Sequence, residues 1–366
     1  MQTLRFNKTT FSGQLPAFLC CAAVLLTALS VPLRADAQSV PSTASAAANP
    51  ATAATATNSA TEQQAAQWLD RIQRAARQQN YEGTFVFQRG AFVQSSRIKH
   101  YATDDGEYEL IESLDGKPRK LLRHNEDVFT FVPERKLVIV EKRQSKDAFP
   151  ALLSTTGDHV LSVYNARTAG TDRVAGLDAE VIELDPKDTY RFAYKLWADA
   201  KTGLLLRAQT LDHTNGQVLE QLAFTQVRIG VPADKTPIAN GIRNTAGWTL
   251  VHSPIEPVDM EAQGWSFGSP VAGFRKIREL RRPMAARNSS DPPIPVDQAV
   301  FSDGLAAISI FVEPVEHNSR KEGAGSSGAT HVLVKRNGDY WITLLGEVPQ
   351  VTLQQFASAI EYKAPR

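Results

Sequence analysis

The sequence contains almost no cysteine. Its only two, Cys20 and Cys21, are adjacent and lie in the first apolar run of the 366-residue chain. The chain beyond this run has no thiol at all. This absence excludes disulfide bonds, thiol catalysis and cysteine-based metal sites from the rest of the protein.

A large excess of one charge is also missing. Forty Lys and Arg residues face 39 Asp and Glu residues, which gives a formal charge of +1. Nucleic-acid-binding proteins usually carry a strong basic excess, so we expect no nucleic-acid partner. Beyond the first segment, no run approaches the roughly 18 apolar residues that a membrane helix needs. The 42% of hydrophobic residues fits a folded protein, and the length suggests two domains.

Sequence signatures of metal and cofactor sites are missing as well. The seven histidines form no H-x-H or H-x-x-x-H pair, the spacings that present two ligands together. The chain has no glycine-rich phosphate loop, and its Asp and Glu residues are dispersed. We therefore expect no metal ion and no cofactor.

One catalytic motif does occur. Residues 264–268 read Gly-Trp-Ser-Phe-Gly and match the G-x-S-x-G nucleophile elbow of hydrolases. That motif needs a strand, a sharp turn and a helix after the serine. Pro270 and Gly273 follow at once, so the alternative that the segment is a strand end is favoured. We expect no enzyme, and a serine hydrolase that uses Ser266 is kept as a minor alternative.

The N-terminal segment has the three parts of a secretory signal peptide. Arg5 and Lys8 precede an apolar core over about residues 15–33, and residues 35–37 (Ala-Asp-Ala) match the cleavage pattern. Cleavage after Ala37 would leave 37 basic and 38 acidic side chains, a net charge of −1. The sequence thus predicts an exported protein that lacks residues 1–37. An uncleaved membrane anchor is the alternative.

The next segment has too few large side chains to form a core. In residues 38–62, 18 of 25 positions are Ala, Ser or Thr, which predicts a disordered tether. Thr61 and Gln64 then match a capping box that begins a helix ending near Asn80. The residues predicted to share its apolar face are Trp68, Leu69, Ile72, Ala75 and Ala76.

The first domain is predicted to cover residues 63–230. From Tyr81 onward, apolar residues alternate with polar ones, and Asp115-Gly116 and Asn215-Gly216 mark hairpin turns. A shorter helix is predicted around residues 148–165. The expected fold is a large curved antiparallel sheet with one or two helices against it. Its predicted strands are residues 84–88, 93–101, 108–113, 118–123, 127–132, 137–141, 190–198, 204–211 and 217–229.

A second, smaller α+β domain is predicted over residues 247–366. Residues 231–246 contain two prolines, a glycine and two asparagines and are predicted as a linker. Residues 283–295 and 323–328 are predicted as loops. Asn337-Gly338 predicts a hairpin, and a second capping box predicts a final helix ending near residue 361. The predicted strands are residues 248–252, 264–267, 305–313, 330–335 and 340–345.

Two features of the sequence are candidate binding sites. A curved sheet can enclose a cavity that binds a lipid or an apolar peptide. The alternative is that the apolar face packs the helix. The candidate lining residues are Phe85, Phe87, Phe129, Phe131, Tyr190, Phe192, Tyr194 and Leu196.

The second feature is a basic run that could meet phosphates or an acidic partner segment. A solvated basic face is the alternative. The residues of the run are Arg275, Lys276, Arg278, Arg281, Arg282 and Arg287.

Several stretches, in combination and in order, make the chain similar to the RseB/MucB family, which regulates the sigma-E (AlgU-type) envelope stress response. They include a Tyr-Glu-Gly-Thr-Phe-Val-Phe segment after the first helix and a Phe-Ser-Asp-Gly-Leu segment in the second domain. Ser269-Pro270-Val271-Ala272 departs from the family's Leu-Pro-x pattern. The stretches that carry the resemblance are residues 81–87, 190–197, 202–207, 216–221, 265–274, 301–305 and 346–349.

The resemblance implies more than the composition does. It implies a larger domain that resembles the lipoprotein carriers LolA and LolB, an unclosed antiparallel β-barrel with packed helices. It implies a smaller domain that grips the periplasmic part of a membrane-anchored anti-sigma factor of the RseA/MucA type. Binding would shield that factor from a DegS-type protease in the periplasm, and lipopolysaccharide or another lipid would release it.

One other reading of the resemblance stays open. A periplasmic lipoprotein carrier of the LolA type would share the first domain, but a carrier needs only that domain. The sequence also leaves open whether the protein forms a homo-oligomer.

Overall fold

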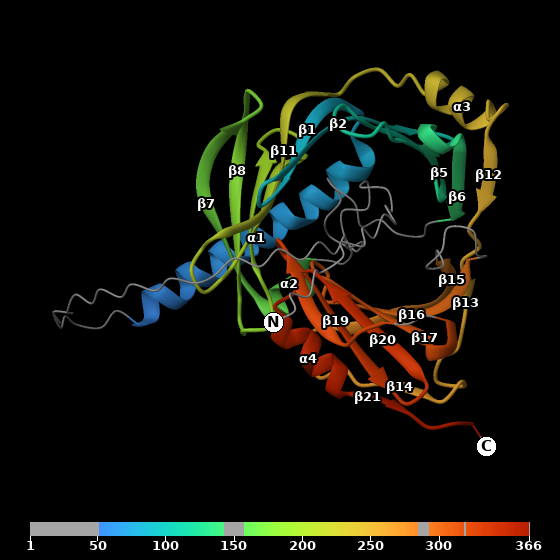
Figure 1. The fold of residues 1–366 in the computed structure, drawn as a ribbon. Helices are drawn as coiled ribbons and strands as arrows, with labels where there is room; N and C mark the ends of the chain where they lie inside the picture. Colours follow the sequence, from blue (N-terminus) through green and yellow to red (C-terminus); the bar gives the residue numbers. More distant parts are fainter. Residues whose placement is uncertain (1–50, 143–156, 285–292, 318–319, 366) are drawn as a thin grey trace, which may run out of the picture.

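A computed structural model describes residues 51–142, 157–284, 293–317 and 320–365, and Figure 1 shows their arrangement. The predicted signal peptide, the first half of the predicted tether and Arg287 of the basic run lie outside the described residues. Two sheets dominate the fold, a larger one in the upper half of Figure 1 and a smaller one below it. The predicted α+β class is confirmed.

The larger sheet has twelve strands in the order β12-β6-β5-β4-β3-β2-β1-β11-β10-β9-β8-β7. Neighbours are antiparallel except β12 and β6, which run parallel. Its two edges do not pair, so the sheet is unclosed, as predicted. Its strands are β1 (Tyr81–Arg89), β2 (Phe92–Thr103), β3 (Gly106–Ser113), β4 (Lys120–His124), β5 (Asp127–Val132), β6 (Leu137–Lys142), β7 (Tyr164–Val174), β8 (Leu177–Pro186), β9 (Ala193–Asp199), β10 (Leu205–Leu211), β11 (Val218–Ile229) and β12 (Thr249–His252).

The predicted hairpins of this sheet are confirmed. β3 pairs with β4 around Gly116, and β10 pairs with β11 around Gly216. Both glycines have positive φ, 69° and 72°, which glycine adopts without the steric cost that a side chain brings. β5 and β6 form the further pair that the alternation of residues 127–141 predicts.

Two strands of this sheet escaped prediction. β7 and β8 form a hairpin at one edge, and residues 169–173 of β7 are exposed. An edge strand with so many exposed positions carries little apolar alternation, which is why its sequence gave no signal. The short helix predicted at 148–165 is α2 (Gly157–Val163), and its predicted first part lies outside the described residues.

Helix α1 (Ala51–Gln78) crosses the concave side of the larger sheet in Figure 1. Its predicted apolar face is confirmed: Leu69 and Ile72 are fully buried in the main core, and Trp68 packs against it. The predicted start is wrong, because the helix runs through Thr61 instead of being capped there. Residues 51–62, predicted as disordered, are alanine-rich, and alanine has the highest helix propensity.

Both faces of the larger sheet carry apolar clusters. The main core lies on the inner face, between α1, α2 and the strands. A smaller outer cluster contains Tyr101, Tyr108, Leu122, Phe131 and Val138. The last of its buried members, Ile238, comes from α3 (Thr236–Arg243), which covers this outer face.

The predicted linker and domain boundary are therefore corrected. Residues 231–246 contain α3, whose Gly241 allows close packing, because a Cβ there would lie 2.6 Å from Leu122 Cδ1. β12 belongs to the larger sheet, and Trp248 packs edge-on against Phe131 with ring centroids 5.2 Å apart. The chain thus leaves the larger sheet after His252, and not at Gly247 as predicted.

The smaller sheet has seven strands in the order β13-β15-β16-β17-β20-β19-β18, and β14 pairs with β21 beside it. Its core lies between the sheet and α4 (Gln350–Ser358), and it includes Trp265, Phe301, Ile310, Leu344 and Phe356. The strands are β13 (Glu256–Pro257), β14 (Trp265–Phe267), β15 (Arg275–Met284), β16 (Ile294–Ser302), β17 (Ala307–Pro314), β18 (Gly323–Ser327), β19 (Thr330–Asn337), β20 (Tyr340–Gly346) and β21 (Ile360–Tyr362).

The smaller sheet confirms one turn and corrects three predictions. The Asn337-Gly338 hairpin joins β19 to β20 as predicted. The segment predicted as a loop at 323–328 is mostly β18. Pro283 and Pro295, the ends of the loop predicted at 283–295, are paired strand residues of β15 and β16, and residues 285–292 lie outside the described residues. Thr352 does not cap α4, which begins after Pro349 without a side-chain cap.

Candidate functional site: the joint between the two sheets

Arg191 lies at the centre of the joint between the two sheets. It precedes β9, and its side chain is fully buried. Its Nε donates to Asp303 Oδ2 at 2.7 Å, and its two terminal nitrogens donate to Asp188 and to the carbonyl of Ala272. The guanidinium carbon also lies 4.9 Å from the centre of the Phe274 ring. The larger sheet thus inserts one cation into the smaller unit.

The carboxylate of Asp303, which accepts that cation, is also held by hydrogen bonds from its own turn. It is fully buried after β16, and its second oxygen accepts the backbone N–H groups of Leu305 and Ala306 at 3.0 and 2.8 Å. The hydroxyl of Ser302 donates to the Ala306 carbonyl at 2.9 Å. The turn therefore holds the carboxylate in place before Arg191 meets it. Such charge-assisted bonds are the stronger kind of hydrogen bond.

Gly273 lets the chain of the smaller unit pass through this joint. Its φ is +87°, and a Cβ there would lie 2.4 Å from Val163 Cγ1 and 2.9 Å from Arg191 Nη2. Its carbonyl oxygen lies 3.1 Å from His159 Nε2 of α2. Only glycine fits between α2 and the guanidinium. We call this contact, from Arg191, Asp303 and Gly273, the arginine clamp.

Two further contacts flank the arginine clamp. The Thr352 hydroxyl donates to the Tyr190 carbonyl at 2.7 Å, which ties α4 to the segment before β9. Tyr190 packs against the core of the smaller sheet. Phe192 stacks on His331 of β19 with ring centroids 6.0 Å apart. The segment 188–192 is therefore shared between the two units.

A separate contact joins the sheets at Glu220 of β11. Its carboxylate accepts Arg89 Nε at 2.8 Å and the backbone N–H of Ala329 at 3.1 Å. Burial raises the pKa of Glu220 to about 7; the nearby charge of Glu347 acts in the same direction and Arg89 opposes it. We call this contact, from Glu220, Arg89 and the Gly328–Ala329 turn, the glutamate latch.

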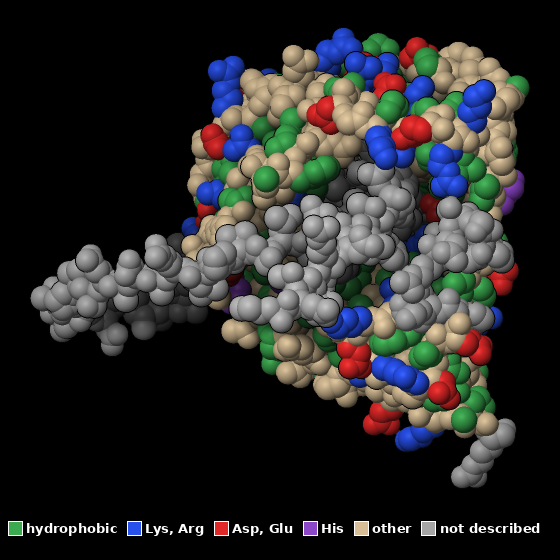
Figure 2. Space-filling view, viewed as in Figure 1, with side chains coloured by type: hydrophobic (Ala, Val, Ile, Leu, Met, Phe, Trp, Pro, Cys, Tyr) green, Lys and Arg blue, Asp and Glu red, His purple; other side chains and the backbone are tan. Residues whose placement is uncertain are grey.

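Three of the five described residues of the predicted basic run are paired with acidic neighbours. Lys276 pairs with Glu261 and Glu279 at 2.7 and 2.9 Å, and Arg281 binds both oxygens of Asp297 at 2.6 and 2.8 Å. Arg282 reaches Glu141 of the larger sheet at 3.3 Å. On the face shown in Figure 2, positive and negative side chains intermingle over both units.

The two other described members of the run differ. Arg275 is exposed, and the Nε atom of Arg278 is buried without a hydrogen-bond partner among the described residues. Because its neighbours are largely paired, the run does not act as one free basic surface.

The eight candidate cavity residues divide among three places. Phe85, Tyr194 and Leu196 lie in the main core on the inner face, and Phe87 packs against that core. Phe129 and Phe131 lie on the opposite, outer face.

Tyr190 and Phe192 precede β9 and lie in the joint, because the strand begins at Ala193 and not at Tyr190 as predicted. The eight residues therefore do not line one cavity. Those on the inner face remain candidates for lining one.

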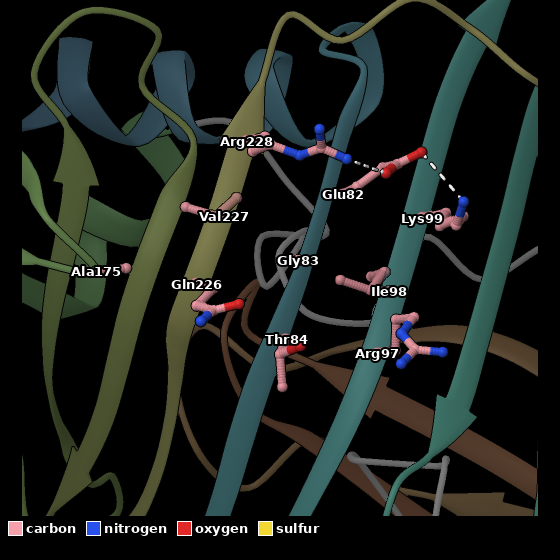
Figure 3. A pocket seen from close by; sticks show the side chains of 10 residues that line it. All are labelled: Glu82, Gly83, Thr84, Arg97, Ile98, Lys99, Ala175, Gln226, Val227 and Arg228. Atoms are coloured by element: carbon pink, nitrogen blue, oxygen red, sulfur yellow. Dashed lines mark hydrogen bonds and ion pairs between the residues drawn. The ribbon is translucent and has the colours of Figure 1, made fainter.

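A cavity of about 430 Å³ lies among β1, β2 and β11 beside the β7–β8 turn, and Figure 3 shows its lining. Glu82 lies at its upper edge in that view, paired with Lys99 at 3.2 Å and with Arg228 at 2.8 Å. The hydrogen bond from Tyr101, together with these cations, lowers the pKa of Glu82. The lining mixes charged and apolar side chains, and none of the eight candidate residues belongs to it.

Gly83 shapes this cavity and explains part of the segment 81–87. A Cβ on Gly83 would lie 2.5 Å from the Gln226 carbonyl oxygen and 2.8 Å from Phe224. Its neighbour Tyr81 stacks on His100 with ring centroids 4.9 Å apart. The glycine thus brings β1 and β11 together over the main core.

The described residues also bear on the metal site, the Ser266 hydrolase and the membrane helix that the sequence raised. Among the described residues, no three His, Cys, Asp or Glu side chains gather as a metal site. The Gly-Trp-Ser-Phe-Gly segment is β14, paired antiparallel with β21, and no helix follows Ser266. None of the helices in the described part of the chain is long and apolar enough to cross a membrane.

Comparison with known families matches both units to the same family. The sequence model of the MucB/RseB N-terminal domain matches residues 64–242, and that of the MucB/RseB C-terminal domain matches residues 259–361. The chain belongs to the MucB/RseB family. The predicted resemblance is thereby confirmed over both units.

Relatives of this family match the chain over most of its length. The sigma-E factor regulatory protein RseB of Haemophilus influenzae is 28% identical, covering 82% of this chain and 92% of that protein. The sigma factor AlgU regulatory protein MucB of Pseudomonas aeruginosa is 29% identical with the same coverage. The fold is similar to MucB in the Pseudomonas aeruginosa MucA/MucB complex, with a TM-score of 0.64, 27% identity and coverage of 82% and 100%.

A second structure, of MucB in complex with MucA(peri), is similar with a TM-score of 0.63 and 26% identity. It covers 82% of this chain and 100% of that chain. MucB/RseB family stretches meet in the joint described above. Arg191 comes from residues 190–197, Gly273 from residues 265–274 and Asp303 from residues 301–305.

The sequence pattern indicated these stretches but not the three residues Arg191, Gly273 and Asp303 within them. The available signal was a charged residue among apolar or turn-forming ones, but residues 190–197 contain two charged residues, Arg191 and Lys195. That signal does not reveal which residue is the partner of which.

Proposed function

We propose that this protein is a periplasmic regulator that binds the periplasmic part of a membrane-anchored anti-sigma factor. Through that factor it would repress a sigma-E-type envelope stress response. The observation that carries the proposal is the similarity, over 82% of the chain and both units, to MucB in its complex with MucA. The names of the sequence relatives support the same role.

The joint suits a protein that binds with both units at once. The arginine clamp buries a full ion pair, with each partner held by further hydrogen bonds. A fixed arrangement of two binding surfaces lowers the ordering cost of gripping an extended partner. Binding would protect the anti-sigma factor by covering the segment that a protease must reach. No catalytic group is needed for this role.

Release would follow from a ligand that prefers the non-gripping arrangement. Such a ligand weakens the partner's affinity by the difference in its own affinity for the two states. We propose an acyl-bearing lipid, for which Phe85 and Phe87 on the inner face of the larger sheet supply apolar contacts. Lipopolysaccharide is the probe that tests this step.

The first test is recovery of partners by the tagged exported chain, residues 38–366, from detergent-solubilised envelopes. We expect a single-span anti-sigma factor, and we expect added lipopolysaccharide to reduce its recovery. Asp303→Asn, which disrupts the arginine clamp, should lower recovery, whereas Glu112→Gln, which breaks an exposed pair with Arg97, should not. Recovery of acylated lipoproteins without an anti-sigma factor would contradict the proposal and favour a carrier.

The second test addresses protection. The purified periplasmic part of that anti-sigma factor is digested by its site-1 protease with and without the regulator. We expect slower cleavage in its presence and restored cleavage when lipopolysaccharide is added. Equal cleavage rates in all three mixtures would leave a binding protein without the protective role and would contradict that part of the proposal.

A further inference from the structure

The glutamate latch is a second, chemically different connection between the two sheets. The Glu220 side chain is 8% exposed, and it lies on the larger sheet. The turn between β18 and β19 of the smaller sheet contacts this carboxylate. A Cβ on Gly328 would lie 2.8 Å from Glu220 Oε1 and 2.5 Å from Arg89 Cγ. The backbone of one unit therefore touches the carboxylate of the other directly.

The charged and titratable groups around this carboxylate come from both units. Arg89 of β1 is the paired cation, and Glu347, which follows β20, is a second acid whose charge acts on Glu220. His331 of β19 places Nδ1 3.3 Å from the Ala329 carbonyl oxygen, and burial lowers the pKa of this imidazole. The charge of a second acid therefore acts on Glu220 beside its paired cation, and a nearby like charge favours protonation of a carboxylate.

We propose that the glutamate latch makes docking of the β18–β19 turn onto the larger sheet dependent on pH, tighter in mildly acidic solution than above neutrality. The arginine clamp stays closed while the latch opens locally. The inference concerns the joint alone and does not depend on the identity of any partner.

The sign follows from proton linkage. The docked Glu220 has a pKa of about 7, and separation would return it to solvent and to the ordinary range of a carboxyl. Docking therefore takes up a proton between those two values. The contribution is fully present below the ordinary value and is lost as the pH rises through about 7. His331 acts in the opposite sense below about pH 6.5, so the Glu220 part is measured as a difference between variants.

The test measures the latch and the clamp separately in the chain of residues 38–366, which has no native cysteine. One pair of thiol spin labels, at Asn215→Cys and Ser326→Cys, spans the latch. A second pair, at Ala169→Cys and Gln354→Cys, reports the remainder of the joint. All four positions are exposed. Distance distributions are recorded from pH 6 to pH 8.

We expect the ratio of docked to open latch to fall about tenfold between pH 6 and pH 8, with the second pair unchanged. Glu220→Gln should keep the latch docked at both pH values. Glu112→Gln, the control on the same sheet, should follow the wild type. The proposal would be overturned if the wild-type distance across the latch did not change with pH. It would also be overturned if the pH dependence of this distance were the same in Glu220→Gln as in the wild type.

A second variant covers the case in which Glu220→Gln fails to fold. Glu347→Gln removes the neighbouring charge, so the pH midpoint of latch opening should move to a lower value than in the wild type. An unmoved midpoint would show that the acid pair does not control docking.

Discussion

The two buried carboxylates at the joint, Asp303 and Glu220, differ in the number of groups that donate hydrogen bonds to them. Asp303 of the arginine clamp is fully buried and accepts two backbone N–H groups as well as a guanidinium. Glu220 of the glutamate latch is met by one guanidinium and one backbone N–H, and a second acid stands nearby. The first carboxylate meets three donors, whereas the second meets two and lies near another acid, which together with burial raises its pKa.

The difference also appears in the glycines that bring the chain close. At the clamp, a Cβ on Gly273 would meet Val163, a branched side chain fixed in the main core. At the latch, a Cβ on Gly328 would meet the unbranched side chains of Arg89 and Glu220, which have more rotamers than a β-branched valine. We therefore expect the clamp to be stiff and the latch to yield.

Breaking the clamp charge should have the largest effect. Asp303→Asn keeps the shape of the side chain but leaves Arg191 buried with one anion fewer. Loss of one partner of a buried pair typically costs about 3–5 kcal/mol, and we expect a decrease of that size in the free energy of unfolding, measured in urea. Glu112→Gln, the exposed control, should change it by less than about 0.5 kcal/mol. A loss below about 1 kcal/mol for Asp303→Asn would show that the clamp is not a stabilising contact.

Filling the close approach at the clamp should come next. Gly273→Ala forces a Cβ against Val163 and adds strain at φ +87°. We expect a loss of about 2–3 kcal/mol in unfolding free energy. Gly216→Ala is the matched control, because its φ is +72° but nothing lies within 4 Å of the added atom. The difference between the two variants isolates the clash, and equal losses would mean that only backbone strain matters.

Removing a single neutral bond of the joint should matter less. Thr352→Val keeps the shape of the side chain but removes the bond to the Tyr190 carbonyl. We expect a loss of about 1–2 kcal/mol, since a partly buried acceptor would be left unpaired. Thermal unfolding measures it, and Ser358→Ala on the exposed face of the same helix is the control. A neutral result would indicate that Tyr190 finds another donor.

How far the sequence predicts this fold depends on the pattern in each segment. Regular alternation and Asn-Gly or Asp-Gly turns located β3 to β6, β10, β11 and the β19–β20 hairpin to within a few residues. The polar edge strand β7 has no such pattern. Helix α3 was hidden by Pro237, Asn240 and Gly241, which usually mark a linker. Here the proline stands in the first turn, and the glycine admits Leu122.

The joint was much harder to predict than the sheets. Arg191 and Asp303 are 112 residues apart, so no local spacing connects them. The basic run drew attention because its charges are closely spaced, yet acidic neighbours pair with three of them, Lys276, Arg281 and Arg282. A charged residue between large apolar ones, such as Arg191 between Tyr190 and Phe192, is the better signal of a buried contact, but it does not identify the partner.

The smallest effect should come from filling the close approach at the latch, and it sharpens the contrast with Gly273. Gly328→Ala keeps φ at +58°, a left-handed value whose cost for alanine is about 1 kcal/mol. The added Cβ meets the unbranched side chains of Arg89 and Glu220, which have more rotamers than Val163, so we expect a smaller further loss of unfolding free energy than at Gly273. The distance between the spin labels at residues 215 and 326 should nevertheless lengthen at every pH. The distance between those at residues 169 and 354 should stay unchanged. A loss as large as that of Gly273→Ala would show that the latch is as rigid as the clamp and would remove the distinction between them.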